Sequence, residues 1–184
     1  MTKAELKQRV WEAIDRRAET IIGLGEQIRH HPELGFKEVK TARLVEKTLA
    51  GIGLAPKAGL AITGVRADAA GGAGAGPTFA LLGELDALVV AGHPERDPQT
   101  GAAHACGHNA QVAGLLGAAM GLVDAKAFEH LTGRVAFVAV PAEEYGDIEW
   151  RVGQARAGKL EFLGGKPELL RLGHFDDVDL AMMI

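Results

Sequence analysis

Two pairs of side chains in the sequence could hold and use a metal ion. Cys106 and His108 stand two residues apart with a glycine between them, and Glu143 and Glu144 are adjacent. Thiolate and imidazole are favoured ligands of zinc and similar borderline ions, so the first pair could converge on one ion from a tight turn. Alternatively, Cys106 could be a small hydrophobic residue that is buried in the core and binds no metal.

The two glutamates follow the apolar run 134–140. Carboxylates at the end of a buried strand are costly unless they are paired, hydrogen-bonded or bound to a metal. Neighbouring residues of an extended chain point in different directions. One of the two could therefore ligate an ion while the other faces a water molecule that the ion activates. The alternative is a solvated turn.

A second pair of acids, Glu84 and Asp86, also follows an apolar run. Their spacing of two predicts that both side chains lie on the same face of an extended segment. Asp86 could orient a histidine ligand or approach the metal itself, or it could simply cap the next turn. All these segments lie at predicted strand ends, where open α/β sheets assemble their ligand sites.

Helices and strands alternate along the chain, which predicts a layered α/β fold. Apolar residues at three- and four-residue steps predict one long helix over 3–28 and further helices over 37–50, 109–123 and 166–172. Strand-like runs cover 61–65, 78–82, 134–140 and 180–184, and the last is expected to be a core strand. The run 134–140 should lie in a sheet that is covered on both faces. The glycine-rich stretch 71–77 is expected to be a flexible hairpin connection.

Composition excludes several classes of protein. The chain has 184 residues, 47% of them hydrophobic, enough for one domain with a real core. Its net charge of −4 provides no basic field, so we expect no nucleic-acid partner. Without a targeting signal or an apolar run long enough for a membrane span, the expected location is the cytoplasm, with no membrane partner. The single cysteine cannot form an internal disulfide.

Four ordered motifs carry a resemblance to a known family. They are HHPELGF (30–36, with Glu38 and Thr41), GELDAL (83–88), HACGHN (104–109) and PAEE (141–144). The chain resembles the amidohydrolase branch of the aminoacylase/carboxypeptidase metallopeptidase clan, with hydrolases of N-acyl amino acids, hippurate, indole-acetyl amino acids and aminobenzoyl-glutamate. The aminobenzoyl-glutamate-hydrolase-like subgroup looks most similar.

The resemblance implies a fold and a set of roles. The fold would be a three-layer, zinc-exopeptidase-like (phosphorylase/hydrolase-like) catalytic domain with a mixed sheet. Cys106, His108 and Glu144 would ligate one or two divalent ions, Zn or Mn in the first place and Co or Ni as alternatives. Glu143 would be the catalytic base and acid, and Asp86 the conserved acid beside the metal. Family members often have Asp where this chain has Glu84, whose role stays open, and HHPELGF is interpreted as architecture.

The resemblance also implies that residues 1–184 are the N-terminal part of a truncated catalytic domain. The missing regions would be a lid or dimerisation domain and the C-terminal part, with further histidine ligands. The parent would be a homodimeric metallo-amidohydrolase acting on small N-acyl amino acids, and the fragment alone would be inactive. One alternative is an inactive metal-binding or scaffolding protein of the same fold. Another is a hydrolase with Cys106 as nucleophile and His104 or His108 as its base.

Overall fold

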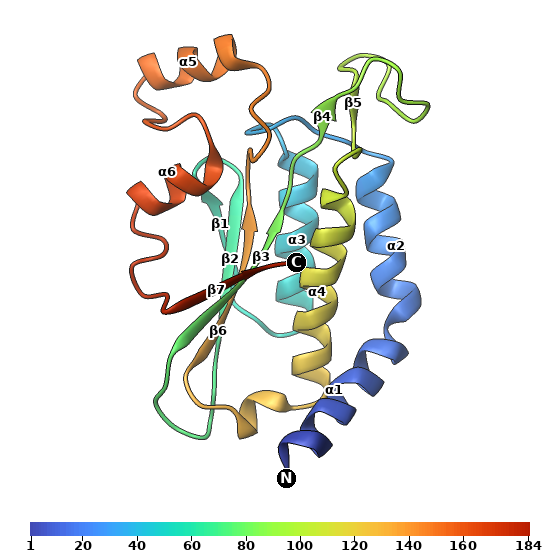
Figure 1. Ribbon diagram of the computed structural model, residues 1–184, viewed down its shortest axis with the longest axis vertical. Coiled ribbons are helices and arrows are strands. Elements are labelled where there is room, and N and C mark those ends of the chain that lie inside the picture. The colour runs from blue at the N-terminus through green and yellow to red at the C-terminus, as the bar shows by residue number, and fades with distance from the viewer.

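The computed structural model describes residues 1–184 and consists of a mixed sheet between two layers of helices (Figure 1). The helices are α1 (Lys3–Arg16), α2 (Ala18–Arg29), α3 (Val39–Gly51), α4 (His108–Asp124), the 3-10 helix η1 (Ala127–His130), α5 (Ile148–Arg156) and α6 (Gly165–Arg171). The strands are β1 (Lys57–Leu60), β2 (Gly64–Ala70), β3 (Thr78–Glu84), β4 (Leu88–Val89), β5 (Ala102–Ala103), β6 (Arg134–Val140) and β7 (Leu180–Met183). The predicted three-layer α/β fold is confirmed.

The five-stranded sheet has the order β1-β2-β6-β3-β7. Strand β6 pairs antiparallel with β2 and parallel with β3, so the most apolar strand occupies the middle of the sheet. Its last five residues are buried, as the continuous apolar run predicts for a strand covered on both faces. Strands β4 and β5 form a separate small hairpin.

Helices α1 to α4 lie on one side of the sheet, and α5 and α6 lie on the other (Figure 1). On the first side, α4 packs between the sheet and α1 and α2. A Cβ atom at Gly121 of α4 would lie 2.5 Å from Cγ1 of Ile14, so only glycine permits this close approach of α1. On the second side, Leu160 and Leu169 pack on buried residues of β3 and β6.

The prediction of one long helix over 3–28 is wrong in one respect, because the chain forms two helices there. Arg17 leaves the helical conformation with φ −97° and ψ 2°, and α2 continues in a new direction (Figure 1). The guanidinium of Arg17 binds the carboxylate of Asp124 at the end of α4, with Nε 2.8 Å from Oδ2. Hydrophobic periodicity does not reveal such a bend, because both helices keep an apolar face toward α4.

The prediction of a hairpin connection over 71–77 is also wrong. Strand β6 inserts between β2 and β3, so the glycine-rich stretch crosses from one side of β6 to the other. It is anchored by backbone hydrogen bonds, among them Gly71 N to Gly133 O at 2.8 Å and Ala73 N to Leu131 O at 3.0 Å.

Two predicted strands differ in detail. The strand expected over 61–65 begins only at Gly64, because Ala61 and Ile62 form a turn with φ angles of 44° and 77°. Strand β7 forms as predicted but is not a core strand. It pairs with β3 alone, and all four of its residues are exposed at the edge of the sheet. None of the helices is both long enough and apolar enough to cross a membrane.

Candidate metal centre

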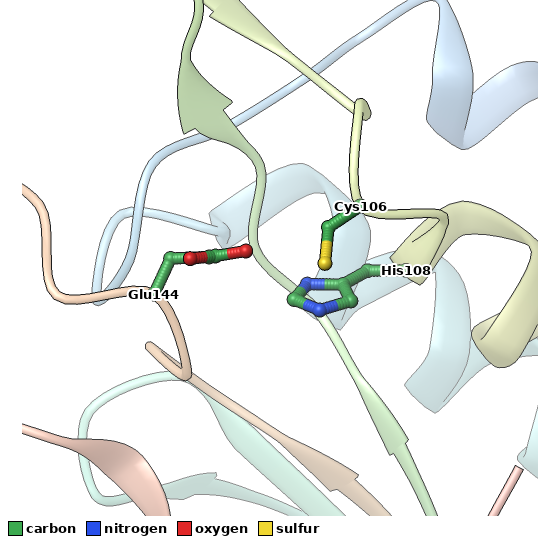
Figure 2. A group of neighbouring side chains, drawn as sticks. All are labelled: Cys106, His108 and Glu144. Atoms are coloured by element: carbon green, nitrogen blue, oxygen red, sulfur yellow. The ribbon is translucent and has the colours of Figure 1, made fainter.

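The chemistry-bearing segments meet at one edge of the sheet. Strands β3 and β6 are parallel neighbours in a register that pairs Glu84 with Val140, so the segments that follow both strands leave the sheet at the same edge. Helix α4 begins there at His108. Figure 2 shows the carboxylate of Glu144 pointing toward the sulfur of Cys106 and the ring of His108. One ligand atom from each of these three residues lies within 4.8 Å of the other two.

The imidazole of His108 is almost completely buried and has a defined orientation. Its Nδ1 lies 2.7 Å from the carbonyl oxygen of Asp86, which can only accept, so Nδ1 carries a proton and donates it. Its Nε2 faces the carboxylates of Glu84, at 2.9 Å, and Glu143, at 3.9 Å. Burial opposes protonation of this ring, but the hydrogen bonds to Asp86 and Glu84 outweigh it and raise the pKa of His108 to about 11.

Asp86 connects the histidine to the glutamate turn. Its carboxylate is fully buried, with Oδ2 accepting the backbone N–H of Glu144 at 2.9 Å. Its Oδ1 lies 3.3 Å from Nδ1 of His108 and has no hydrogen-bond partner. Glu84 and Asp86 contact the same imidazole, Glu84 at Nε2 and Asp86 at Nδ1. Asp86 orients His108 and the turn without facing the Nε2 side of the ring.

Glu84 pairs with a residue that the motifs do not include. Its carboxylate binds the ammonium group of Lys166 in α6 as well as His108. Burial opposes ionisation of Glu84, but these two partners outweigh it and lower its pKa to about 2. Lys166 also lies 3.7 Å from Oε1 of Glu143. The sequence signal for Lys166 is only a lysine after two glycines, which by itself indicates nothing about a site.

Glu143 and Glu144 lie in different groups of side chains. Glu144 joins Cys106 and His108, while Glu143 lies beside Glu84 and Lys166 with its side chain one-third exposed. Burial, together with the charge of Glu84, raises the pKa of Glu143. A carboxylate with a raised pKa that still reaches solvent is suited to accept and return a proton.

The surroundings of Cys106 do not favour the thiolate form that a nucleophile needs. Hydrogen bonding to Glu144 raises the pKa of the exposed Cys106 thiol. Nucleophilic cysteines instead have lowered pKa values. His104 provides no base either, because both of its ring nitrogens are buried without a partner. Burial and the nearby His108 lower the pKa of His104 to about 4.

The donor set fits a divalent ion. Sulfur, imidazole nitrogen and carboxylate oxygen are all ligands of zinc, and their separation is short enough for one ion to contact all three. A ligating histidine usually donates its other N–H to a carbonyl or carboxylate, as His108 does to Asp86. In a second group, formed by Glu84, His108 and Glu143, the ligand atoms also lie within 4.8 Å of one another.

Two buried charged residues near the site received no role from the sequence, although Glu38 accompanies the first motif. Glu38 is completely buried, and burial raises its pKa to about 7 despite a hydrogen bond from Thr63. Arg151 is also buried and donates to the carbonyl oxygen of Glu144. The HHPELGF segment contributes packing, for example through the buried Phe36, which agrees with its architectural interpretation. A buried glutamate and a buried arginine have no local signal, because both residue types usually lie at the surface.

Comparison with known proteins assigns this chain to a family. The sequence profile of peptidase family M20/M25/M40 matches residues 80–178, which hold all segments of the candidate metal centre. This chain is a member of that family. The M20 match covers more than half of the chain and includes three of the four motifs, those at 83–88, 104–109 and 141–144.

Curated relatives and solved structures give the same result. IAA-amino acid hydrolase ILR1-like 5 of Arabidopsis thaliana is 37% identical over 147 residues, which are 78% of this chain and 32% of that protein. N-acetyl-L-cysteine deacetylase of Bacillus subtilis is 36% identical over 129 residues, covering 68% of this chain and 30% of that protein. The crystal structure of Bacillus subtilis YXEP, described as a dinuclear metal-binding peptidase of the M20 family, superposes with a TM-score of 0.69 at 27% identity and covers 89% of this chain and 41% of that one.

A Klebsiella pneumoniae aminobenzoyl-glutamate utilization protein has the same fold. Its structure superposes with a TM-score of 0.67 at 22% identity, over 96% of this chain and 46% of that one. This M20 chain spans about a third of the length of the curated relatives that it matches.

Proposed function

We propose that this chain belongs to the catalytic domain of a metal-dependent hydrolase that cleaves the amide bond of N-acyl amino acids. The observation that carries the proposal is the oriented His108, whose Nδ1–H is held by Asp86 while Cys106 and Glu144 lie within ligand distance. The names of two relatives, an IAA-amino acid hydrolase and an N-acetyl-L-cysteine deacetylase, support amino-acid conjugates as the substrate class. N-aminobenzoyl amino acids belong to the same chemical class.

In this proposal Cys106, His108 and Glu144 hold the ion. Zn²⁺ suits the mixed sulfur, nitrogen and oxygen set, and Mn²⁺, Co²⁺ and Ni²⁺ are alternatives. A divalent ion there supplies Lewis-acid chemistry, which polarises a water molecule and the substrate carbonyl. Binding an ion through a ring nitrogen would require His108 to give up one of its two protons, so we expect the centre to load with release of protons.

Glu143 is the proposed proton carrier. Its raised pKa and its one-third exposed side chain allow it to take a proton from the attacking water and return it to the departing amine. Asp86 keeps His108 in the tautomer with the proton on Nδ1, and it fixes the backbone of Glu144. Lys166 balances the charge of Glu84 beside the proton carrier.

The whole protein is proposed to extend beyond the segment described here. By resemblance to its family, it would add a lid or dimerisation domain, the rest of the catalytic domain and further histidine ligands, and it would act as a homodimer. Substrate selection would then depend largely on those regions.

The test is a hydrolysis assay on the whole protein. Release of the free amine is measured with N-acetyl, N-benzoyl and N-aminobenzoyl amino acids, before and after chelation and after return of Zn²⁺ or Mn²⁺. We expect hydrolysis that chelation abolishes and metal restores. Hydrolysis indifferent to chelation would contradict the proposal. Tightly bound metal without hydrolysis of any conjugate would favour the inactive metal-binding alternative.

A further inference from the structure

The turn that presents Glu143 and Glu144 is held by its backbone from several directions. The N–H of Ala142 donates to Oε1 of Glu38 at 2.7 Å, and the carbonyl oxygen of Ala142 accepts from the N–H of Gly165 at 3.1 Å. The carbonyl oxygen of Glu144 accepts from Nη2 of Arg151 at 2.5 Å. These contacts leave the two glutamate side chains free for the site while their backbone is fixed.

Ala142 needs this support because its backbone is unfavourable for an alanine. Its φ of 48° lies in the left-handed region, which residues with a Cβ atom rarely adopt. Neighbouring backbone also packs so closely against the turn that two adjacent positions have no room for a Cβ atom. A Cβ atom at Gly165 would lie 1.7 Å from the carbonyl oxygen of Pro141, and one at Gly35 would lie 2.9 Å from Cα of Ala142.

Glu38 is the most unusual of the groups that hold the turn. It lies 104 residues away in the sequence, just before α3, and its side chain is completely buried. Its second carboxylate oxygen accepts from the hydroxyl of Thr63 at 2.6 Å. Burying a carboxylate is expensive unless hydrogen bonds compensate. Glu38 joins neither group of candidate metal ligands, so direct ligation does not account for its burial.

We infer that Glu38 is a positioning residue for the metal centre, which acts by holding the N–H of the strained Ala142 so that Glu144 meets Cys106 and His108. The inference rests on the proposed metal site. Glu38 itself touches neither the ion nor the substrate. Its effect on metal binding should therefore pass through the geometry of the 142–144 turn.

The test compares shortened and isosteric variants of this chain with Co²⁺ as the probe. Glu38→Asp withdraws the carboxylate from Ala142, whereas Glu38→Gln keeps an oxygen that can accept the same N–H. Glu168→Asp is the matched control, because Glu168 is also completely buried and accepts the backbone N–H groups of Glu161 and Phe162. For each variant, Co²⁺ affinity is read from the cobalt–thiolate absorption, Ala142 amide exchange by NMR, and the unfolding midpoint in urea.

We expect Glu38→Asp to weaken Co²⁺ binding by about 10- to 100-fold, the usual effect of disturbing groups that orient ligands, and to speed exchange at Ala142. The Co²⁺ affinity of Glu38→Gln should stay within about threefold of that of the parent. The same holds for Glu168→Asp, even if it loses as much stability as Glu38→Asp, because neither change loosens the 142–144 turn. Unchanged affinity and exchange in Glu38→Asp would overturn the inference, and so would equal weakening by Glu168→Asp. If the parent chain binds no Co²⁺, the same variants are compared in the whole protein, which is proposed to supply further histidine ligands. A whole protein that binds no Co²⁺ would overturn the metal site and this inference with it.

A milder variant decides the matter if Glu38→Asp does not fold. Thr63→Val removes only the hydroxyl that anchors the second carboxylate oxygen of Glu38. Faster exchange at Ala142 together with weaker Co²⁺ binding would support the inference. Parent-like values for both measurements would overturn it.

Discussion

Two charged clusters of this molecule differ in how far their charges balance. On β2, Arg66 binds Asp68 and Asp177 with Nη2 at 2.7 and 2.8 Å, and Arg134 adds a contact to Asp177 at 3.0 Å. Two guanidinium groups there face two carboxylates. We call these four residues the arginine cluster.

The candidate metal centre has no such balance. It holds four carboxylates, those of Glu84, Asp86, Glu143 and Glu144, and one lysine and one histidine, which contact three of the four. One oxygen of Asp86 stays without a partner, and the pKa of Glu143 is raised. The arginine cluster satisfies itself and serves the fold, whereas the acidic excess at the sheet edge is better satisfied by an added cation.

The largest expected effect is that of Glu143→Gln on turnover in the whole protein. The amide cannot accept a proton, so we expect kcat to fall by about 100- to 10,000-fold, the range usual for general acid–base groups. Metal content should be unchanged, because Glu144 still serves as ligand. Amine release and elemental analysis measure the two quantities. Turnover within tenfold of the parent would remove Glu143 from the proposed role.

Substitutions in the two clusters should differ in their effect on metal binding, and Cys106→Ser tests the candidate metal centre. Replacing the soft sulfur by a hydroxyl removes the strongest ligand of the set, and we expect Zn²⁺ affinity to fall by at least about 100-fold. Asp177→Asn in the arginine cluster is the control and should leave affinity unchanged. Both are checked by elemental analysis of protein purified without chelators. Equal zinc in parent and Cys106→Ser would refute the site.

The pH dependence of stability should have opposite signs near the two clusters. Burial raises the pKa of Glu38 to about 7, so the folded state binds more protons than the unfolded state between about pH 4.5 and 7. The free energy of unfolding should therefore fall across this window as pH rises, by up to about 3 kcal/mol at 1.36 kcal/mol per pKa unit. The decline should become shallower in Glu38→Gln, because Glu143 and His108, whose pKa values are also raised, still contribute to it. Urea unfolding of the metal-free chains at several pH values measures it, and identical slopes in the two chains would contradict the prediction.

At Asp177 the hydrogen bond from Arg66 lowers the pKa below its usual 3.8. Its stabilising contribution is therefore present above about pH 4 and is lost as pH falls further. Asp177→Asn should reduce stability at neutral pH and converge with the parent in acid. A deficit that persisted undiminished at low pH would show that packing, and not charge, makes the contribution.

The smallest expected effect is that of Arg66→Met. The side chain of Arg66 is only 9% exposed, but its two aspartates reach solvent and can rehydrate. We therefore expect a loss of about 2 kcal/mol in the free energy of unfolding, near the values for hydrogen bonds to charged groups. Zinc affinity should not change. A loss of zinc binding in Arg66→Met would mean that the two clusters are energetically coupled.

The sequence alone was sufficient for the strongly patterned parts of this protein. The apolar run 134–140 predicts a covered central strand, and the helix over 109–123 is buried against its neighbours. The motifs also identified Cys106, His108 and Glu144, which the structure brings together. Such features are predictable because periodicity and residue chemistry are properties of short segments.

Only the tertiary structure decided how these segments combine. It placed β6 between β2 and β3, bent the first helix at Arg17, and brought Lys166 to Glu84 and Glu38 to Ala142. The last two pairs join residues 82 and 104 positions apart. No local pattern marks such partners, because a buried charge is tolerated only where the complete fold supplies its hydrogen bonds.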